Sequence, residues 1–523
     1  MTTPCHLPES DWTVTRTLQA LASAELVYEQ VLGHLAERLD EQHGTCYGKE
    51  GWRYALGAWL LHLVHPVIAY FEEDLIHQTP SPREHAFPDF DFLNYFRQLS
   101  SAADTQAQFL TALRILRDNP CKKKFPSSSL RKRLSGKTPQ LRAPDPSKIN
   151  LRAMRLSTRN REALQSSKTF SKIATPWSLE SLPVPLVCET NLSWRLQKGE
   201  YTMDSTVATC LAMAELTLPA VYLEAFPALR PKARGSSPFS CCTSNAFYSD
   251  VAYGFYLAEN HATSHSIHHQ HGGGYGIDRA HALEQFERRV SKKYFTWGWS
   301  GSDHSDTEPL PQPPNLISTE EQPKGSCLLI CVSFPTFVYR LHNHPTAKRA
   351  SSLVKDTLHF LKLVPPAVNL RVRPYPHDYG HGFARRLSTE THHQLEEEET
   401  IRQWRMESTC SFSIVVANYL GTAWLETLSA NIPTVCFYDP QVYAFREKAA
   451  PIISDMLAAG ILHESPESAA EHLNRIHQDP DAWWRKSETQ DVRERFCSQF
   501  ALTSVQWVEH WEEHFSDHLH AGN

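Results

Sequence analysis

The chain has 523 residues, of which 41% are hydrophobic, so it is too long for one hydrophobic core and has enough apolar side chains for two or three domains. A formal net charge of −6 argues against a general nucleic-acid-binding protein. The twelve cysteines include no CxxC pair, which excludes the usual patterns of a disulfide framework or a zinc ribbon.

The first part of the chain predicts helices. Residues 1–14 show no basic stretch followed by an apolar one, so we expect no secretory signal and a cytoplasmic protein. Apolar residues then recur at three-to-four spacing over residues 21–74. The most apolar part, residues 54–71, contains Pro66 and falls short of the roughly 20 apolar residues that cross a bilayer, so we expect a buried helix.

Residues 121–172 carry fifteen Lys and Arg residues against Asp145 and Glu162, with prolines and serines between them. This composition predicts a mobile basic insertion in the first domain. Its simpler interpretation is a solvated loop, because runs of like charge usually stay in water. The functional interpretation is contact with anionic lipid at the inner face of the membrane, or with a phosphate-bearing acceptor.

Strands and helices alternate through most of the remaining chain, which predicts an α/β fold. We divide it into an N-terminal domain over residues 1–300, a linker over 301–325 rich in Ser, Asp, Glu and Pro, and a C-terminal domain over 326–490. The C-terminal domain should contain a doubly wound parallel sheet. Its expected strands are residues 327–332, 369–373, 413–416 and 434–437, and its expected helices are residues 347–363 and 422–430. Residues 491–517 predict an amphipathic C-terminal helix.

The strongest candidate for an anion site is the turn before the helix that begins at Thr422. A strand, Gly421 and this helix start would present backbone N–H groups and a positive dipole end to a ligand phosphate. Glu426, one turn into the helix, could reach a ribose or sugar hydroxyl. The alternative is an ordinary tight turn in which Thr422 belongs to the helix cap.

A second candidate is His271, which precedes Gly272, Gly273 and Gly274. Glycines allow a ligand to approach the backbone closely, and imidazole can act as a general base near neutral pH. The alternative is a flexible glycine loop. We expect no metal here, because no Cys, Asp or Glu lies among the neighbouring histidines at ligand spacing.

Arg373 ends the expected strand 369–373 and is followed by two prolines that stiffen the chain. At this position a guanidinium could hold a donor diphosphate through paired hydrogen bonds. The alternative is a surface arginine.

Several motifs recur in order along the chain. They read LDEQHGTCYGKEGWRYALGAWL at residues 39–60, QHGGGYG at 270–276, YFTWGW at 294–299, RPYPHDYG at 373–380, YLGTAWLETLSANIPT at 419–434 and GILHESPESAA at 460–470. Together they resemble a family of transferases from bacterial O-antigen and surface-polysaccharide gene clusters. The QHG element also resembles the His-Gly element of the glycerophosphotransferases of teichoic-acid synthesis, which implies a catalytic role for His271.

The resemblance implies a GT-B glycosyltransferase with an extra N-terminal helical region. Two Rossmann-like domains would face each other across a cleft, with the nucleotide-sugar donor held mainly by the second and a saccharide or lipid-linked acceptor by the first. The final helix would cross back to the first domain. No cofactor or metal is expected. The alternatives are a nucleotide-sugar 2-epimerase of the same fold and a non-catalytic protein that binds polysaccharide or a lipid carrier.

Overall fold

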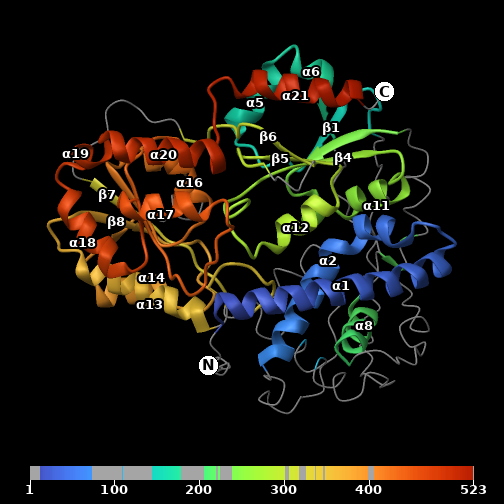
Figure 1. The fold of residues 1–523 in the computed structure, drawn as a ribbon, viewed down its shortest axis with the longest axis horizontal. Helices are drawn as coiled ribbons and strands as arrows, with labels where there is room; N and C mark the ends of the chain where they lie inside the picture. The colour runs from blue at the N-terminus through green and yellow to red at the C-terminus, as the bar shows by residue number, and fades with distance from the viewer. Residues whose placement is uncertain are drawn as a thin grey trace.

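A computed structural model describes residues 12–73, 109, 113, 144–177, 205–218, 222–223, 226, 238–300, 306–316, 326–335, 337–345, 348–397 and 406–521. These residues form two lobes, each built on a six-stranded sheet in which all neighbouring strands are parallel (Figure 1). The α/β class expected from the sequence is therefore observed. The two-sheet arrangement fits a pair of Rossmann-like domains.

Two long helices begin the described chain, α1 (Val14–His43) and α2 (Gly48–Glu73). The Thr13 side chain caps the start of α1, and Gly44 ends it in the left-handed conformation. The shorter helices α8 (Ser205–Thr217) and α11 (Val251–Glu259) share a hydrophobic core with them. Among the described helices, α2 has the length and apolar composition of a membrane span, but 89% of its most apolar window is buried inside the protein.

The first sheet has the strand order β2-β1-β3-β4-β5-β6. Its strands are β1 (Ile149–Arg152), β2 (Ala174–Pro176), β3 (Ser240–Thr243), β4 (His265–His269), β5 (Lys293–Thr296) and β6 (Thr307–Pro309). The helices around it are α5 (Thr158–Ser166), α6 (Phe170–Ile173), α10 (Ala246–Ser249), α11 and α12 (Ala282–Arg289).

Two segment boundaries expected from the sequence differ from those that this sheet shows. The basic insertion expected over residues 121–172 contains β1, α5 and α6 in its second half, while residues 121–143 lie outside the described chain. Ile149, Leu164 and Phe170 are buried in one cluster, and the exposed basic residues between them hid this apolar pattern. The linker expected over 301–325 contains β6, so the first lobe continues to Pro309.

The second sheet has the strand order β12-β11-β10-β7-β8-β9. Its strands are β7 (Ser326–Ile330), β8 (Asn369–Arg373), β9 (Gln394–Leu395), β10 (Ile414–Ala417), β11 (Thr434–Phe437) and β12 (Leu462–His463). The helices of this lobe are α13 (Lys348–Leu363), α14 (Phe383–Glu390), the 3₁₀ helix η3 (Met406–Ser411), α16 (Thr422–Ser429), α17 (Ala450–Ala458), α18 (Pro466–Ile476), α19 (Pro480–Trp484) and α20 (Ser487–Phe500).

The strand order of the second sheet reverses between β7 and β10. From β7 the chain proceeds outward through β8 and β9, and from β10 it proceeds outward in the opposite direction. Loops on the two sides of such a point diverge and leave a crevice outside the carboxyl ends of the strands, where ligands bind in folds of this type.

The C-terminal helix expected over residues 491–517 is two helices. The first, α20, packs on α16 and α17 of the second lobe, and the second, α21 (Trp507–Ala521), lies over the first sheet beside α5 and α6 (Figure 1). Trp511 and Phe515 are fully buried there, and the Trp511 indole N–H donates to the Pro311 carbonyl at 2.9 Å. The chain therefore crosses back to the first lobe within residues 501–506.

Other contacts also join the lobes. The segment 337–345, which follows β7, leaves the second lobe and contacts the first. There the Leu341 N–H donates to His65 Nδ1 of α2 at 3.0 Å, and the Asn343 N–H donates to the Ala280 carbonyl at 2.9 Å. The loops at the carboxyl ends of the two sheets consequently meet.

Candidate functional site

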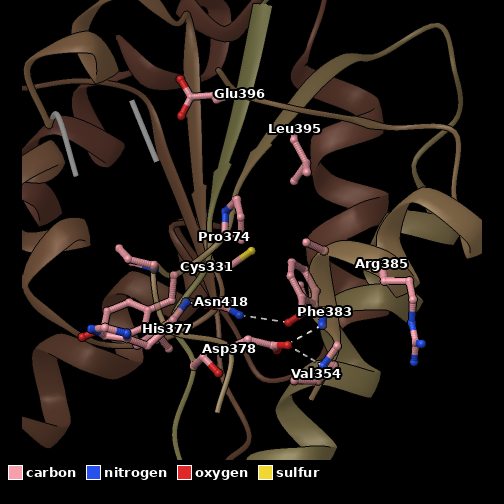
Figure 2. Close-up of a pocket in the computed structure, with 17 residues that line it drawn as sticks. Cys331, Val354, Pro374, His377, Asp378, Phe383, Arg385, Leu395, Glu396 and Asn418 are labelled. Carbon is pink, nitrogen blue, oxygen red and sulfur yellow. Dashed lines mark hydrogen bonds between the residues drawn. The ribbon is translucent and has the colours of Figure 1, made fainter. Parts of the chain in front are cut away.

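A cavity of about 470 Å³ lies at the reversal point of the second sheet (Figure 2). Cys331 after β7, Pro374 after β8 and Asn418 after β10 contribute to its wall. Asn418 spans the reversal point, because its Oδ1 accepts from the Val332 N–H at 2.9 Å and its Nδ2 donates to Thr357 Oγ1 at 2.9 Å. The crevice expected from the strand order is therefore present. The two hydrogen bonds hold the Asn418 side chain in place in its wall.

One wall of the cavity is the loop between β8 and α14. The Asp378 carboxylate accepts from the Gly382 N–H at 2.8 Å and the Phe383 N–H at 3.1 Å, which caps the start of α14 (Figure 2). Tyr375 and His377 of the same loop also line the cavity. This loop corresponds to the RPYPHDYG motif, so the motif builds a cavity wall.

The loop after β4, which carries His271, is held by Gln270. The Gln270 side chain donates to the Gly272 carbonyl at 2.9 Å and accepts from the Trp297 backbone N–H at 3.0 Å and the Trp299 indole N–H at 2.8 Å. The QHG and YFTWGW motifs are therefore parts of one hydrogen-bonded unit, in which Gln270 fixes the position of its neighbour His271.

A fully buried carboxylate, Glu287 of α12, lies beneath His271. Tyr248 and Tyr275 donate to its Oε1 at 3.0 and 3.1 Å, and Tyr294 donates to its Oε2 at 3.0 Å. His268 Nε2 lies 3.2 Å from the same Oε2. Burial raises the pKa of this carboxyl, but the neighbouring His268 and His271 outweigh burial and lower the pKa to about 2. Glu287 is therefore ionised at neutral pH.

His271 lies close to this carboxylate. Its Nδ1 lies 3.8 Å from Glu287 Oε1 and 3.5 Å from the Tyr275 hydroxyl, and its side chain is 10% exposed, whereas His268 is fully buried. Nε2 has no hydrogen-bond partner within the described part of the chain. Burial lowers the pKa of His271 to about 3 against the opposing effect of Glu287. The imidazole is thus neutral at pH 7 and can accept a proton at Nε2.

Ligand atoms of His268, His271 and Glu287 lie within 4.8 Å of one another, so this set could also hold a metal ion. The sequence analysis missed Glu287 as a partner because it lies 16 residues after His271 and on a different element. Three tyrosine hydroxyls already donate to the Glu287 carboxylate. This arrangement favours a hydrogen-bonded base over a metal ligand.

The glycine loop and the turn before α16 are in direct contact. The Gly273 N–H donates to Thr422 Oγ1 at 3.1 Å, across 149 positions of sequence. A Cβ added at Gly273 would lie 2.6 Å from the carbonyl carbon and oxygen of Gly421, and one at Gly272 would lie 3.4 Å from Thr422 Oγ1. Gly274 has a φ of 86°, which favours glycine. The structure thus brings the two strongest sequence candidates together.

Two other predicted site residues, Arg373 and Glu426, form hydrogen bonds with other residues of the protein. The Arg373 guanidinium is fully buried, pairs with Glu396, and donates to Ser408 at 2.7 Å and Thr409 at 3.0 Å. This geometry favours a structural role over a direct contact with a donor diphosphate. Glu426 accepts from the Asn315 side chain at 2.7 Å, so one of its oxygens faces the connection between the lobes. The sugar or ribose contact of Glu426 stays a prediction.

The contact at Gly273 gives a direct test of the packing between the lobes. Gly273→Ala should lower the free energy of unfolding by about 1–3 kcal/mol, because the added methyl meets backbone atoms that cannot rotate away. Thermal unfolding would measure the effect. Gly33→Ala in α1 is the control, since a methyl added there meets nothing within 4 Å and alanine favours a helix. Equal melting temperatures for both variants would contradict the tight contact.

The fold and these contacts define a two-lobed α/β protein with a cavity in one lobe and a histidine–carboxylate pair in the other. A family model described as LIC12162 family transferase matches residues 2–74 and 97–515. Because the match covers most of the chain, the protein belongs to the LIC12162 family of transferases. No curated protein matches the chain. Family membership supports a general transferase role for the protein.

Proposed function

We propose that the protein is a GT-B-type glycosyltransferase that moves a glycosyl or related group from a nucleotide-activated donor to an acceptor during surface-polysaccharide or O-antigen synthesis. The observation that carries this proposal is the contact of Gly273 with the Gly421–Thr422 turn. It brings the loop that carries His271 into contact with the turn before α16, which would bind the donor phosphates in this proposal. Sites between two domains are a common place for ligands.

The donor is assigned to the second lobe. The cavity at the reversal point has the volume of a small-molecule site, and crevices at that place bind nucleotides in doubly wound sheets. Gly421 and Thr422 would face the donor phosphates through the start of α16. The Gly273 contact covers part of this turn, so the proposal requires the lobes to separate for donor entry and to close again for reaction.

The acceptor is assigned to the first lobe, next to His271. Nε2 of the neutral imidazole would accept the proton of an acceptor hydroxyl, and Glu287, which faces Nδ1, would stabilise the imidazolium that results. The acceptor oxygen forms a bond to the transferred carbon as the bond to the donor phosphate breaks, and the diphosphate leaves with the electron pair. Charge on the leaving group would be stabilised by the protein, and the proposed reaction uses no metal or cofactor.

A thermal-shift screen over nucleoside diphosphates and nucleotide sugars tests the proposal. A ligand that binds only the native protein at about 100 times its dissociation constant stabilises it by about 2.7 kcal/mol. The best donor is then incubated with and without saccharide or lipid-linked acceptors. Transfer that depends on the acceptor supports the proposal. A change of the sugar without an acceptor would indicate an epimerase, and the absence of nucleotide binding would indicate a non-catalytic binding protein.

The pH profile of the reaction follows from the environment of His271. The active base is the neutral imidazole, and burial lowers its pKa to about 3, so the inactive protonated form should accumulate only in acid. We expect kcat/KM to stay constant from pH 8 down to about pH 5. Initial rates across this range, with folding followed by circular dichroism, measure the profile. A midpoint near 6.5, the value of a solvated imidazole, would contradict the buried base.

We also propose a cytoplasmic protein that contacts the inner face of the membrane. The support is the excess of basic residues over 121–143 in the sequence, together with exposed Arg159, Arg161 and Lys168 in the described part that follows. Flotation with anionic vesicles at low and high salt tests this contact. Equal binding after deletion of residues 121–143 would show that this segment does not contact the membrane, which favours its interpretation as a solvated loop.

A further inference from the structure

The Tyr275 hydroxyl lies between His271 and Glu287. It donates to Glu287 Oε1 at 3.1 Å and lies 3.5 Å from His271 Nδ1. The Nδ1 and Oε1 atoms themselves are 3.8 Å apart, which is longer than a hydrogen bond. The hydroxyl is therefore the nearer partner of Nδ1. Tyr275 belongs to the same QHGGGYG motif as His271.

The directions of these hydrogen bonds follow from the chemistry of the three groups. A phenol has one hydrogen to donate, and an ionised carboxylate is a stronger acceptor than a neutral imidazole. The Tyr275 hydrogen consequently goes to Glu287, and the hydroxyl oxygen is left as an acceptor that faces His271 Nδ1. A neutral imidazole carries one hydrogen, so a hydrogen on Nδ1 leaves the lone pair on Nε2.

The Tyr275 side chain is confined on several sides. The residue is buried, and its ring lies against His281 with the ring centroids 4.1 Å apart and stacks on Tyr294 at 6.4 Å. The next residue, Gly276, has a φ of 73°, and a Cβ added there would overlap the Trp299 ring. The packing of the ring and the glycine turn together restrict where the hydroxyl can lie.

We propose that Tyr275 is the positioning residue of His271: its hydroxyl oxygen accepts the Nδ1 hydrogen, keeps the lone pair of the neutral imidazole on Nε2, and links the ring to Glu287. This assignment rests on the proposed function for its effect on turnover. When Nε2 takes the proton of the acceptor hydroxyl, the Nδ1 hydrogen stays on the ring. Its bond to the Tyr275 oxygen strengthens, because the imidazolium is charged. No proton passes to Glu287, which stays ionised.

Nitrogen NMR of the full-length protein, isotope-labelled in its histidine rings, tests the tautomer without any substrate. The signals of His271 are those that disappear in His271→Gln. In the wild type at neutral pH the hydrogen should be on Nδ1. In Tyr275→Phe the share of molecules with the hydrogen on Nε2 should rise, because Nδ1 has lost its acceptor. A hydrogen on Nε2 in the wild type, or an unchanged tautomer in Tyr275→Phe, would overturn the proposal.

Tyr294→Phe is the matched control. Tyr294 is buried like Tyr275 and donates to the other oxygen of Glu287 at 3.0 Å, but it forms no hydrogen bond with His271 in the described part of the chain. Both phenylalanine variants remove one donor from the same carboxylate, so their melting temperatures should fall by similar amounts. Only Tyr275→Phe should change the tautomer. An equal change of tautomer in both variants would show that the carboxylate sets it, and would overturn the role of Tyr275.

Turnover distinguishes this inference from the proposed function. Tyr275→Phe should lower kcat about tenfold to a hundredfold, the cost of one hydrogen bond to a charged group, with nucleotide affinity unchanged. Tyr294→Phe should lower kcat less. If Tyr275→Phe keeps the wild-type tautomer and kcat while His271→Ala loses transfer, the positioning role is wrong and the transferase proposal stands. If the tautomer changes as expected but no acceptor-dependent transfer is found, the positioning role stands and His271 serves a different reaction.

Discussion

His271→Ala should lower turnover by a factor of about 100 to 10,000 while leaving nucleotide affinity nearly unchanged. The range is that of a lost general base, and the binding of the donor is assigned to the other lobe. His271 is the partly exposed member of its buried cluster, and its Nδ1 faces Glu287, which leaves Nε2 for the acceptor. Single-turnover rates and nucleotide titrations on the same preparation measure the two effects.

His265→Ala is the matched control for His271→Ala. His265 begins the same strand, β4, at the end opposite to the one that leads to His271, and its side chain is only partly buried. Activity close to wild type is expected for it. Full activity of His271→Ala, or a parallel loss of nucleotide binding, would show that His271 serves packing beside the glycine loop and is not the base.

Glu287→Ala should lower the free energy of unfolding by about 3–5 kcal/mol, the cost of breaking a buried charged network. The substitution leaves three tyrosine hydroxyls, those of the buried Tyr275 and Tyr294 and of the partly buried Tyr248, without their acceptor. Urea unfolding followed by tryptophan fluorescence measures the loss. Glu471→Ala is the control, because Glu471 is 74% exposed on α18 and should change stability by less than about 0.5 kcal/mol.

Glu287→Gln separates the structural role of this residue from its catalytic one. The amide keeps the volume and one acceptor oxygen, so stability should fall less than in Glu287→Ala. Turnover should still fall, because an amide cannot stabilise the imidazolium on His271. Stability near wild type in Glu287→Ala would contradict the buried network, and full turnover in Glu287→Gln would remove Glu287 from the proposed mechanism.

Four of the six strands of the second sheet, β7, β8, β10 and β11, were predicted from apolar or alternating runs between turn residues, whereas the two-residue strands β9 and β12 were not predicted. The ranges expected for β8 and β11 agree with those observed, residues 369–373 and 434–437. The edge strand β6 was not predictable, since its sequence is Thr-Glu-Pro and its partner β5 supplies the pairing. β1 was hidden by the basic residues around it, although its Ile149 is fully buried.

The candidate site was predictable in part. Placing His271 and the Gly421–Thr422 turn together required only the rule that ligand sites commonly form between domains. Their chemical roles stay predictions. Glu287 was missed, although a signal existed: it lies on the apolar face of α12 with Leu283, Phe286 and Val290, where a carboxylate is costly unless it is bonded.

For Arg373 the sequence suggested a ligand contact that the structure does not favour. Its position at the end of a parallel strand suggested a ligand contact, but its acidic partner, Glu396, lies after the next strand and could not be identified from spacing. Arg340, by contrast, lies in a segment without periodicity. Among the residues that the structure describes, its buried Nε has no hydrogen-bond partner, which only the placement of the neighbouring elements shows.

The crossing of α21 back to the first lobe affects the order in which the protein can fold during synthesis. Trp507, Trp511 and Phe515 cover β-strands of a sheet whose own chain ends about 200 residues earlier, at Pro309. Until residue 515 has left the ribosome, that apolar face lacks its cover, so the first lobe cannot be completed before the second has been synthesised. Folding of the two lobes is therefore interdependent, and nascent chains stalled within the second lobe should be targets for chaperones.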